Sequence, residues 1–141
     1  MKTASRIILL VAAIESIIAA VTFLILGLVF IYLGISTEAK AEIIRSLENG
    51  MTTTSFTGTY EEQATAIQAV FAFLGVFFLI YMFLTAANGV MSFIARTKFN
   101  KPTLIISLVL GFVSLMVVNS VGSILGLVAE SQAKIEWKNN Y

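Results

Sequence analysis

The sequence lacks the residues on which most site chemistry depends. Cysteine and histidine are absent and every acidic residue is a glutamate, which removes thiol nucleophiles, disulfides, imidazole bases and zinc or iron sites built on these side chains. No stretch matches a Walker loop, a dinucleotide fingerprint or a GxSxG elbow, and the few basic residues form no nucleic-acid patch. We therefore expect no enzymatic activity, no cofactor, no metal site and no nucleic-acid partner.

Charge is also scarce. Charged residues make up 12% of the 141-residue chain and hydrophobic residues 58%, whereas soluble domains average about 25% charged residues. Three apolar stretches cover residues 7–33, 66–95 and 103–129, and each exceeds the ~20 residues that cross a bilayer. The remaining segments are too short to bury a core of their own. The sequence predicts an all-α integral membrane protein, a single transmembrane domain over residues 1–141 with three long transmembrane helices.

The segment between the first two spans, residues 36–62, has its own organisation. Residues 37–49 show helical periodicity and end in Asn49-Gly50, which predicts a short helix on the outer surface. Residues 51–59 are rich in threonine and serine, which favours extended or irregular structure. Thr59 and Glu62 have the spacing of a capping box and predict the start of the second long helix.

The charges flanking the apolar stretches predict an orientation in the cell membrane. The 36–62 loop has a net charge of minus three, from five glutamates against one lysine and one arginine. The N-terminus and the link between the second and third stretches carry only basic residues: Lys2, Arg6, Arg96, Lys98 and Lys101. By the positive-inside rule we expect these two segments to be cytoplasmic, with the loop and the C-terminus outside. The loop has no Asn-x-Ser/Thr site, as a bacterial origin would allow.

Glu15 is the ionisable residue inside the first stretch. It lies about 13 Å beyond Arg6 along a helix, and Asn88 lies about 12 Å before Arg96, so the two residues match in depth. The second stretch carries a stripe of polar residues at helical spacing: Tyr81, Thr85, Asn88 and Ser92. Together with Glu15 these residues form the candidate intramembrane polar network. Glu15 is either a structural acid hydrogen-bonded to Asn88 or Thr85, a docking site for a basic partner residue, or a proton or cation site.

Small and polar residues recur along the third stretch. They are Gly111, Ser114, Asn119, Gly122 and Gly126, and the last two form a GxxxG motif. Such a motif removes side-chain bulk and lets two helix backbones approach closely. The sequence leaves open whether this face packs within one chain or forms an oligomer interface.

A glutamate early in the first helix, in Ala12-Ala13-Ile14-Glu15-Ser16, resembles the small multidrug resistance exporters, in which a first-helix glutamate couples proton and drug movement. The resemblance covers only these residues, because the chain has three apolar stretches rather than four and lacks the matching aromatic-glycine motifs. Length and span count also resemble the three-span holins.

Three helices are too few to enclose a transport path, so we expect assembly with the same or another membrane protein. The leading hypothesis is a non-enzymatic accessory or assembly subunit that forms homo- or hetero-oligomers through its small-residue helix faces. The alternative is an oligomeric channel, a holin-like pore or a proton-coupled exporter that uses Glu15.

Overall fold

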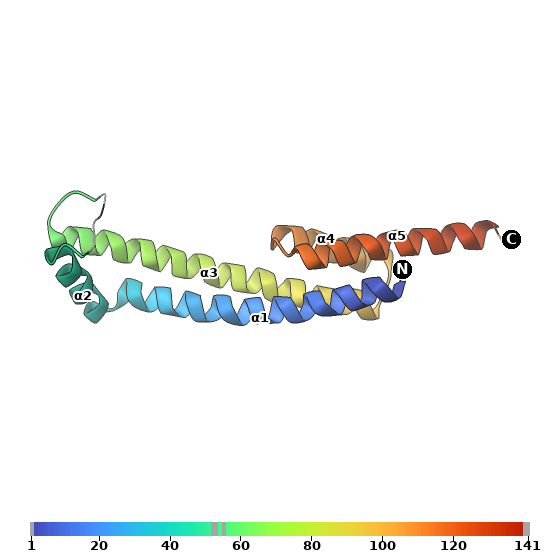
Figure 1. The fold of residues 1–141 in the computed structure, drawn as a ribbon, viewed down its shortest axis with the longest axis horizontal. Helices are drawn as coiled ribbons and strands as arrows, with labels where there is room; N and C mark the ends of the chain where they lie inside the picture. The colour runs from blue at the N-terminus through green and yellow to red at the C-terminus, as the bar shows by residue number, and fades with distance from the viewer. Residues whose placement is uncertain (1, 52–53, 55, 140–141) are drawn as a thin grey trace. The chain divides into compact units, whose positions relative to one another are not determined.

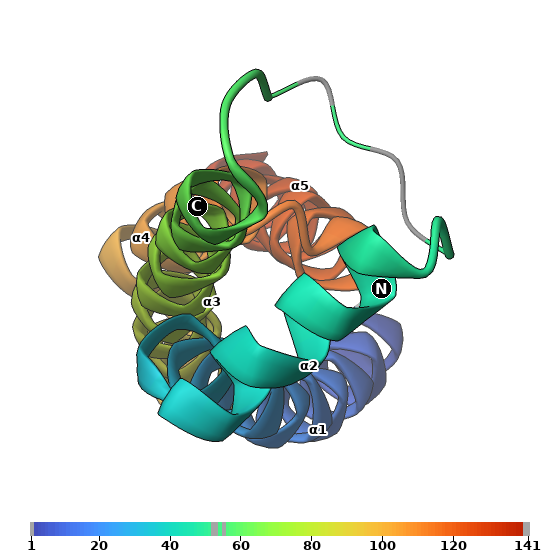
Figure 2. The ribbon, with the colours of Figure 1, turned by 90° about the vertical axis from the view of Figure 1, so that its left-hand side faces the viewer.

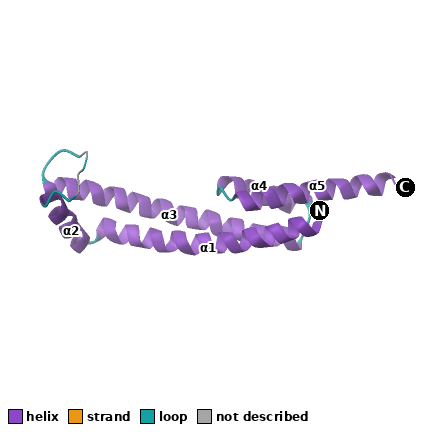
Figure 3. Ribbon diagram, viewed as in Figure 1, coloured by secondary structure: helices purple, strands orange, loops and turns teal. Residues whose placement is uncertain are grey.

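The computed structural model describes residues 2–51, 54 and 56–139, and within these ranges every regular element is a helix (Figure 3). The helices are α1 (Lys2–Ile35), α2 (Thr37–Glu48), α3 (Tyr60–Thr97), α4 (Lys101–Val113) and α5 (Val117–Asn139) (Figure 1). The chain forms two compact units. We call Met1–Val21 with Tyr81–Tyr141 the hairpin unit, and Thr22–Ile80 the loop unit. The all-helical prediction is confirmed for the described residues.

Of the described helices, α1 and α3 are long and apolar enough to cross a membrane. They contain the first two predicted spans. The third predicted span, at 103–129, is wrong, because α4 ends at Val113 and α5 begins again at Val117. The two helices lie side by side and run in opposite directions (Figure 1). An α4 of 13 residues is about 20 Å long, which is less than the ~30 Å hydrocarbon core of a bilayer.

The reversal between α4 and α5 is a hydrogen-bonded helix stop. Leu115 has a positive φ of 56°, and its N–H donates to the carbonyl of Phe112 at 3.2 Å. The N–H of Met116 donates to the carbonyl of Gly111 at 2.8 Å. A left-handed residue with these two bonds is the Schellman stop, in which glycine is usual and leucine is uncommon. The apolar sequence therefore carries no visible signal that the helix ends here.

The hairpin unit packs around a small apolar core at the base of the α4–α5 pair. Leu9, Ala95 and Leu104 are fully buried, and Phe99 and Leu127 pack against them. This core joins α1, α3, α4 and α5 through side chains that lie far apart in the sequence. It fixes where α5 runs alongside α1 and α4.

In the loop unit, α1 and α3 approach each other at glycines. A Cβ added to Gly34 would lie 2.6 Å from the backbone nitrogen of Ala72, and one added to Gly75 would lie 2.8 Å from that of Ile31. Phe30 fills the adjoining space, with ring centroids 5.7 Å from Phe71 and 5.4 Å from Phe78. The helices therefore touch through backbone at the glycines and through aromatic rings between them.

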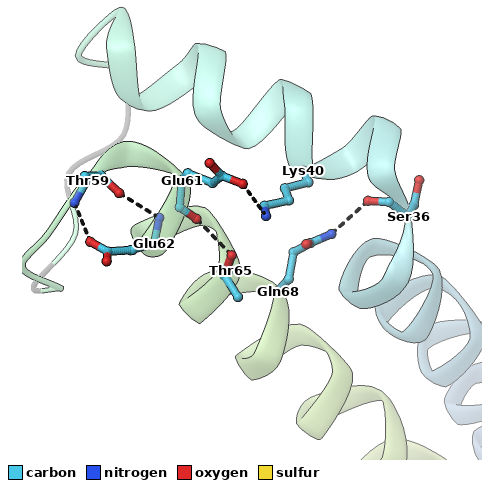
Figure 4. A network of polar contacts seen from close by, with 7 residues as sticks. All are labelled: Ser36, Lys40, Thr59, Glu61, Glu62, Thr65 and Gln68. Carbon is cyan, nitrogen blue, oxygen red and sulfur yellow. Dashed lines mark hydrogen bonds and ion pairs between the residues drawn. The ribbon is translucent and has the colours of Figure 1, made fainter.

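Polar side chains hold the corner where α1 gives way to α2 in the loop unit (Figure 4). The Gln68 side-chain amide donates to the carbonyls of Ser36, at 2.8 Å, and Leu33, at 3.1 Å, near the end of α1. Lys40 of α2 pairs with Glu61 of α3 at 3.4 Å. Gln68 thus satisfies the Leu33 carbonyl near the end of α1 and adds a second hydrogen bond to the Ser36 carbonyl, which also accepts the Lys40 N–H. Gln68 is not among the residues predicted above from the sequence.

The predicted helix at 37–49 is confirmed as α2, which leads through a loop to α3 (Figure 2). The predicted capping box is also confirmed, because the Thr59 N–H donates to the Glu62 carboxylate at 2.8 Å and the Glu62 N–H donates to the Thr59 hydroxyl at 3.3 Å. Residues 54 and 56–59 are not helical, as expected. Residues 52, 53 and 55 of the same predicted irregular segment lie outside the described residues.

Candidate functional site

The hairpin unit contains a buried network of hydroxyl and amide groups centred on Asn119 of α5. The Asn119 side-chain NH₂ donates to the Asn88 side-chain oxygen and, at 2.7 Å, to the backbone carbonyl of Ser107. Its oxygen accepts from the hydroxyls of Ser92, at 2.7 Å, and Ser107, at 2.9 Å. The Asn88 NH₂ then donates to the Ser16 hydroxyl at 2.8 Å. This network connects α1, α3, α4 and α5.

All five side chains of this Asn119 network are fully buried. Both amides use donor and acceptor atoms within it, so the network compensates for their removal from water. It contains no group that titrates near neutral pH. The arrangement can therefore hold four helices in one register through neutral groups, because none of its five side chains is an acid or a base. Ser123, one turn further along α5, is different, because its buried hydroxyl has no hydrogen-bond partner among the described residues.

Glu15 lies next to Ser16 in the chain but on another face of α1. Successive residues of a helix are rotated by about 100°, so only one of the two can point toward Asn88. The structure brings Ser16 to Asn88, and Glu15 is exposed. The apolar residues around Glu15 on the same helix are Val11, Ile14, Ile18 and Ala19, which line a shallow hollow with it. The prediction that this level of α1 lies beside Asn88 agrees with the structure. The residue that contacts Asn88 is Ser16 rather than Glu15, because Ser16 lies on the face of α1 that points toward α3.

The other residues of the predicted polar stripe also fall into two groups, those within the Asn119 network and those outside it. Asn88 and Ser92 belong to the Asn119 network. Thr85 is buried, but its hydroxyl donates within α3 to the carbonyls of Met82, at 2.9 Å, and Tyr81, at 3.1 Å. Tyr81 is half-buried one turn earlier on the same helix. The hydrogen bonds of the Thr85 hydroxyl therefore stay within α3 and do not link α3 to another helix among the described residues.

The small residues of the third predicted span are in contact with the chain's own helices. A Cβ on Gly111 would lie 2.9 Å from the Asn119 amide nitrogen, and a Cβ on Gly126 would lie 2.6 Å from Leu104. A Cβ on Gly122 would lie 3.0 Å from Ile8, and its carbonyl accepts the Ser5 hydroxyl at 2.8 Å. Ser114 caps the end of α4. The GxxxG motif thus brings α5 against α1 and α4 within one chain.

No family model, curated protein sequence or solved structure matches the chain.

Proposed function

We propose that the protein is an integral membrane protein in which α1 and α3 cross the bilayer. The most apolar windows of these helices are 6% and 11% buried within the chain, whereas the core helix of a soluble protein is mostly buried. Their exposed side chains include many large apolar residues, such as Ile18, Phe73 and Phe83, which are 63%, 71% and 68% exposed. Lipid is the surrounding that such a surface requires.

We further propose that the α4–α5 hairpin enters and leaves the membrane on one side. Gly126 of α5 packs beside Leu104, near the start of α4, and beside Ser5, near the start of α1. The C-terminal part of α5 therefore returns to the level of the basic residues that flank α1 and α3. By the positive-inside rule this side is cytoplasmic. The C-terminus would then be cytoplasmic, in place of the outside location that three crossings imply.

Within this membrane architecture, a non-enzymatic accessory subunit is the function that the geometry supports best. The observation that carries the proposal is the exposed Glu15 on an otherwise apolar face of α1. An acid facing lipid near the middle of a helix costs roughly 2.5–3.5 kcal/mol on the insertion scale. A contact that pairs or hydrogen-bonds the carboxyl group removes that cost. Among the described residues, none forms a hydrogen bond or an ion pair with the Glu15 side chain, so we infer that this contact comes from outside the chain.

The chemistry of the partner follows from the distribution of basic residues. The long helices contain no lysine or arginine between Arg6 and the end of α1, and none between the start of α3 and Arg96. A second copy of this chain therefore brings no cation to the depth of Glu15. We infer that the partner is a different membrane protein with a basic residue on a transmembrane helix. The pore or exporter alternative instead requires Glu15 to line a pathway shared between copies.

Photocrosslinkers placed at Ile14 and Ile18 in native membranes test this docking function. We expect both positions to form an adduct with one other membrane protein, and Val109 of α4, which is also exposed, to form none. Glu15→Leu should weaken the complex about threefold to twentyfold, because a polar contact between membrane helices contributes about 0.6–1.7 kcal/mol. Adducts between copies alone would favour the pore alternative. Equal adducts at Val109, or none at all three positions, would contradict docking at Glu15.

A further inference from the structure

We propose that the hairpin unit binds an anionic phospholipid in the groove between α1 and α3. The phosphate would lie at Arg6 and Arg96, and an acyl chain would follow the groove toward Ala20. This inference rests on the proposed membrane insertion of α1 and α3. It does not involve Glu15 or a protein partner, so the two proposals can fail separately.

The polar end of the site is a hollow of about 540 Å³ that both arginines line. Thr3 and Thr97 line the same hollow, although the Thr97 hydroxyl donates within α3 to the carbonyls of Phe93 and Ile94. Among the described residues, neither arginine forms an ion pair with an acid, and the hollow contains no acidic side chain. The Arg6 guanidinium lies 5.4 Å from the centre of the Phe99 ring, a contact that orients the cation but does not neutralise it. Two uncompensated cations at the cytoplasmic boundary favour a phosphate.

The apolar end of the site is a groove of about 400 Å³ lined entirely by apolar residues. Small side chains make it hollow, and larger ones form its walls. The α1 side includes Ala13, Ile17 and Ala20, and the α3 side includes Ala86, Gly89 and Phe93. No polar atom in this groove would hold a water-soluble ligand. An acyl chain is the occupant that matches its surface.

Helical spacing shows that the two hollows belong to one face of each helix. On α1, the step from Arg6 to Ala13 is seven residues and the step from Ala13 to Ala20 is seven more. On α3, Ala86, Phe93 and Arg96 follow at steps of seven and three. These steps repeat one helix face. The groove begins about 10 Å from Arg6, within the ~15 Å depth of one leaflet.

Native mass spectrometry of the full chain in mild detergent tests the site, with phosphatidylglycerol and phosphatidylcholine of identical acyl chains as probes. We expect the first phosphatidylglycerol to bind about tenfold more tightly than phosphatidylcholine, because two arginines face its anionic group. The double variant Arg6→Gln and Arg96→Gln should remove this preference. Lys98→Gln should keep it, since Lys98 lines neither hollow.

A second pair of variants tests the acyl-chain groove. Ala86→Leu should fill the groove and weaken both lipids severalfold, whereas Ala87→Leu is the matched control, because Ala87 is exposed but does not line the groove. The proposal is overturned if the wild type binds both lipids equally, if the arginine double variant keeps the preference, or if the two leucine variants behave alike. Displacement of the lipid by inorganic phosphate alone would also overturn it, since it would assign the arginines to a free anion.

Discussion

Asn119→Leu is expected to destabilise the hairpin unit by about 2–3 kcal/mol. The substitution removes an amide that bonds to Asn88, Ser92 and Ser107. It leaves the Asn88 side-chain oxygen and the Ser107 hydroxyl without this partner in a buried site, while the Ser92 hydroxyl keeps its bond to the Asn88 carbonyl. An unsatisfied buried group costs about 1–3 kcal/mol, although polar contacts in membranes average nearer 0.6 kcal/mol. The loss of several contacts at once places the expected value in the upper part of this range. SDS-induced unfolding in mild detergent, followed by the fluorescence of Trp137 on α5, measures the change.

Ser120→Ala is the control for this experiment, because among the described residues the Ser120 hydroxyl donates only to the nearby Met116 carbonyl, at 3.3 Å. Its stability should stay within about 0.5 kcal/mol of the wild type. Combining Asn88→Leu with Asn119→Leu should cost less than the sum of the two single changes, since each single variant already removes the hydrogen bond between the two amides. Additive losses, or an Asn119→Leu protein as stable as Ser120→Ala, would contradict the Asn119 network.

Gly34→Ala is expected to destabilise the loop unit by about 2 kcal/mol. The new Cβ would lie 2.6 Å from the backbone nitrogen and 2.8 Å from the Cα of Ala72, and neither atom can move without shifting α3. Overpacking of this kind costs about 1–3 kcal/mol. Hydrogen exchange at the C-terminal end of α1 should accelerate, and the SDS midpoint measured by circular dichroism should fall.

Gly89→Ala is the matched control for the glycine contact. Its Cβ would lie 3.1 Å from the side-chain Cβ of Ser16 and 3.5 Å from the nearest backbone atom, the carbonyl oxygen of Ala13, so a small adjustment relieves the contact. We expect a loss below about 1 kcal/mol. Equal effects of the two substitutions would show that the close approach of α1 and α3 at Gly34 is not a determinant of stability.

The long helices and their caps could be predicted because local sequence determines them. A run of apolar residues defines α1 and α3, and Thr59 with Glu62 gives a capping box that needs no tertiary contact. The α4–α5 reversal could not be predicted in this way. Residues 113–117 contain neither glycine nor proline, so hydropathy continues through a chain reversal that Leu115 makes in a left-handed conformation. In the structure this reversal occurs where α5 packs against α4 and α1, and such contacts between distant residues cannot be read from the local sequence.

The candidate site shows a similar division. The rise per residue of a helix places Glu15, Asn88 and their neighbours at one depth. Which residue of α1 faces Asn88 depends on the rotation of α1 about its axis, and this rotation is set by packing and brings Ser16 to Asn88. The part played by Asn119 in linking four helices also depends on the hairpin, because three straight spans would not bring it beside Ser107. The sequence indicated which residues are polar at this depth. It could not indicate which of them share a network.

The location of the C-terminus tests the membrane architecture most directly. Single cysteines at Ser46, Lys98 and Glu136, in a chain that has no cysteine of its own, can be labelled with an impermeant thiol reagent. We expect Ser46 to react in intact cells, and Lys98 and Glu136 to react only after the membrane is permeabilised. This result requires two crossings and a hairpin that returns to the cytoplasmic side. Reaction of Glu136 together with Ser46 in intact cells would contradict the returning hairpin and establish a third crossing.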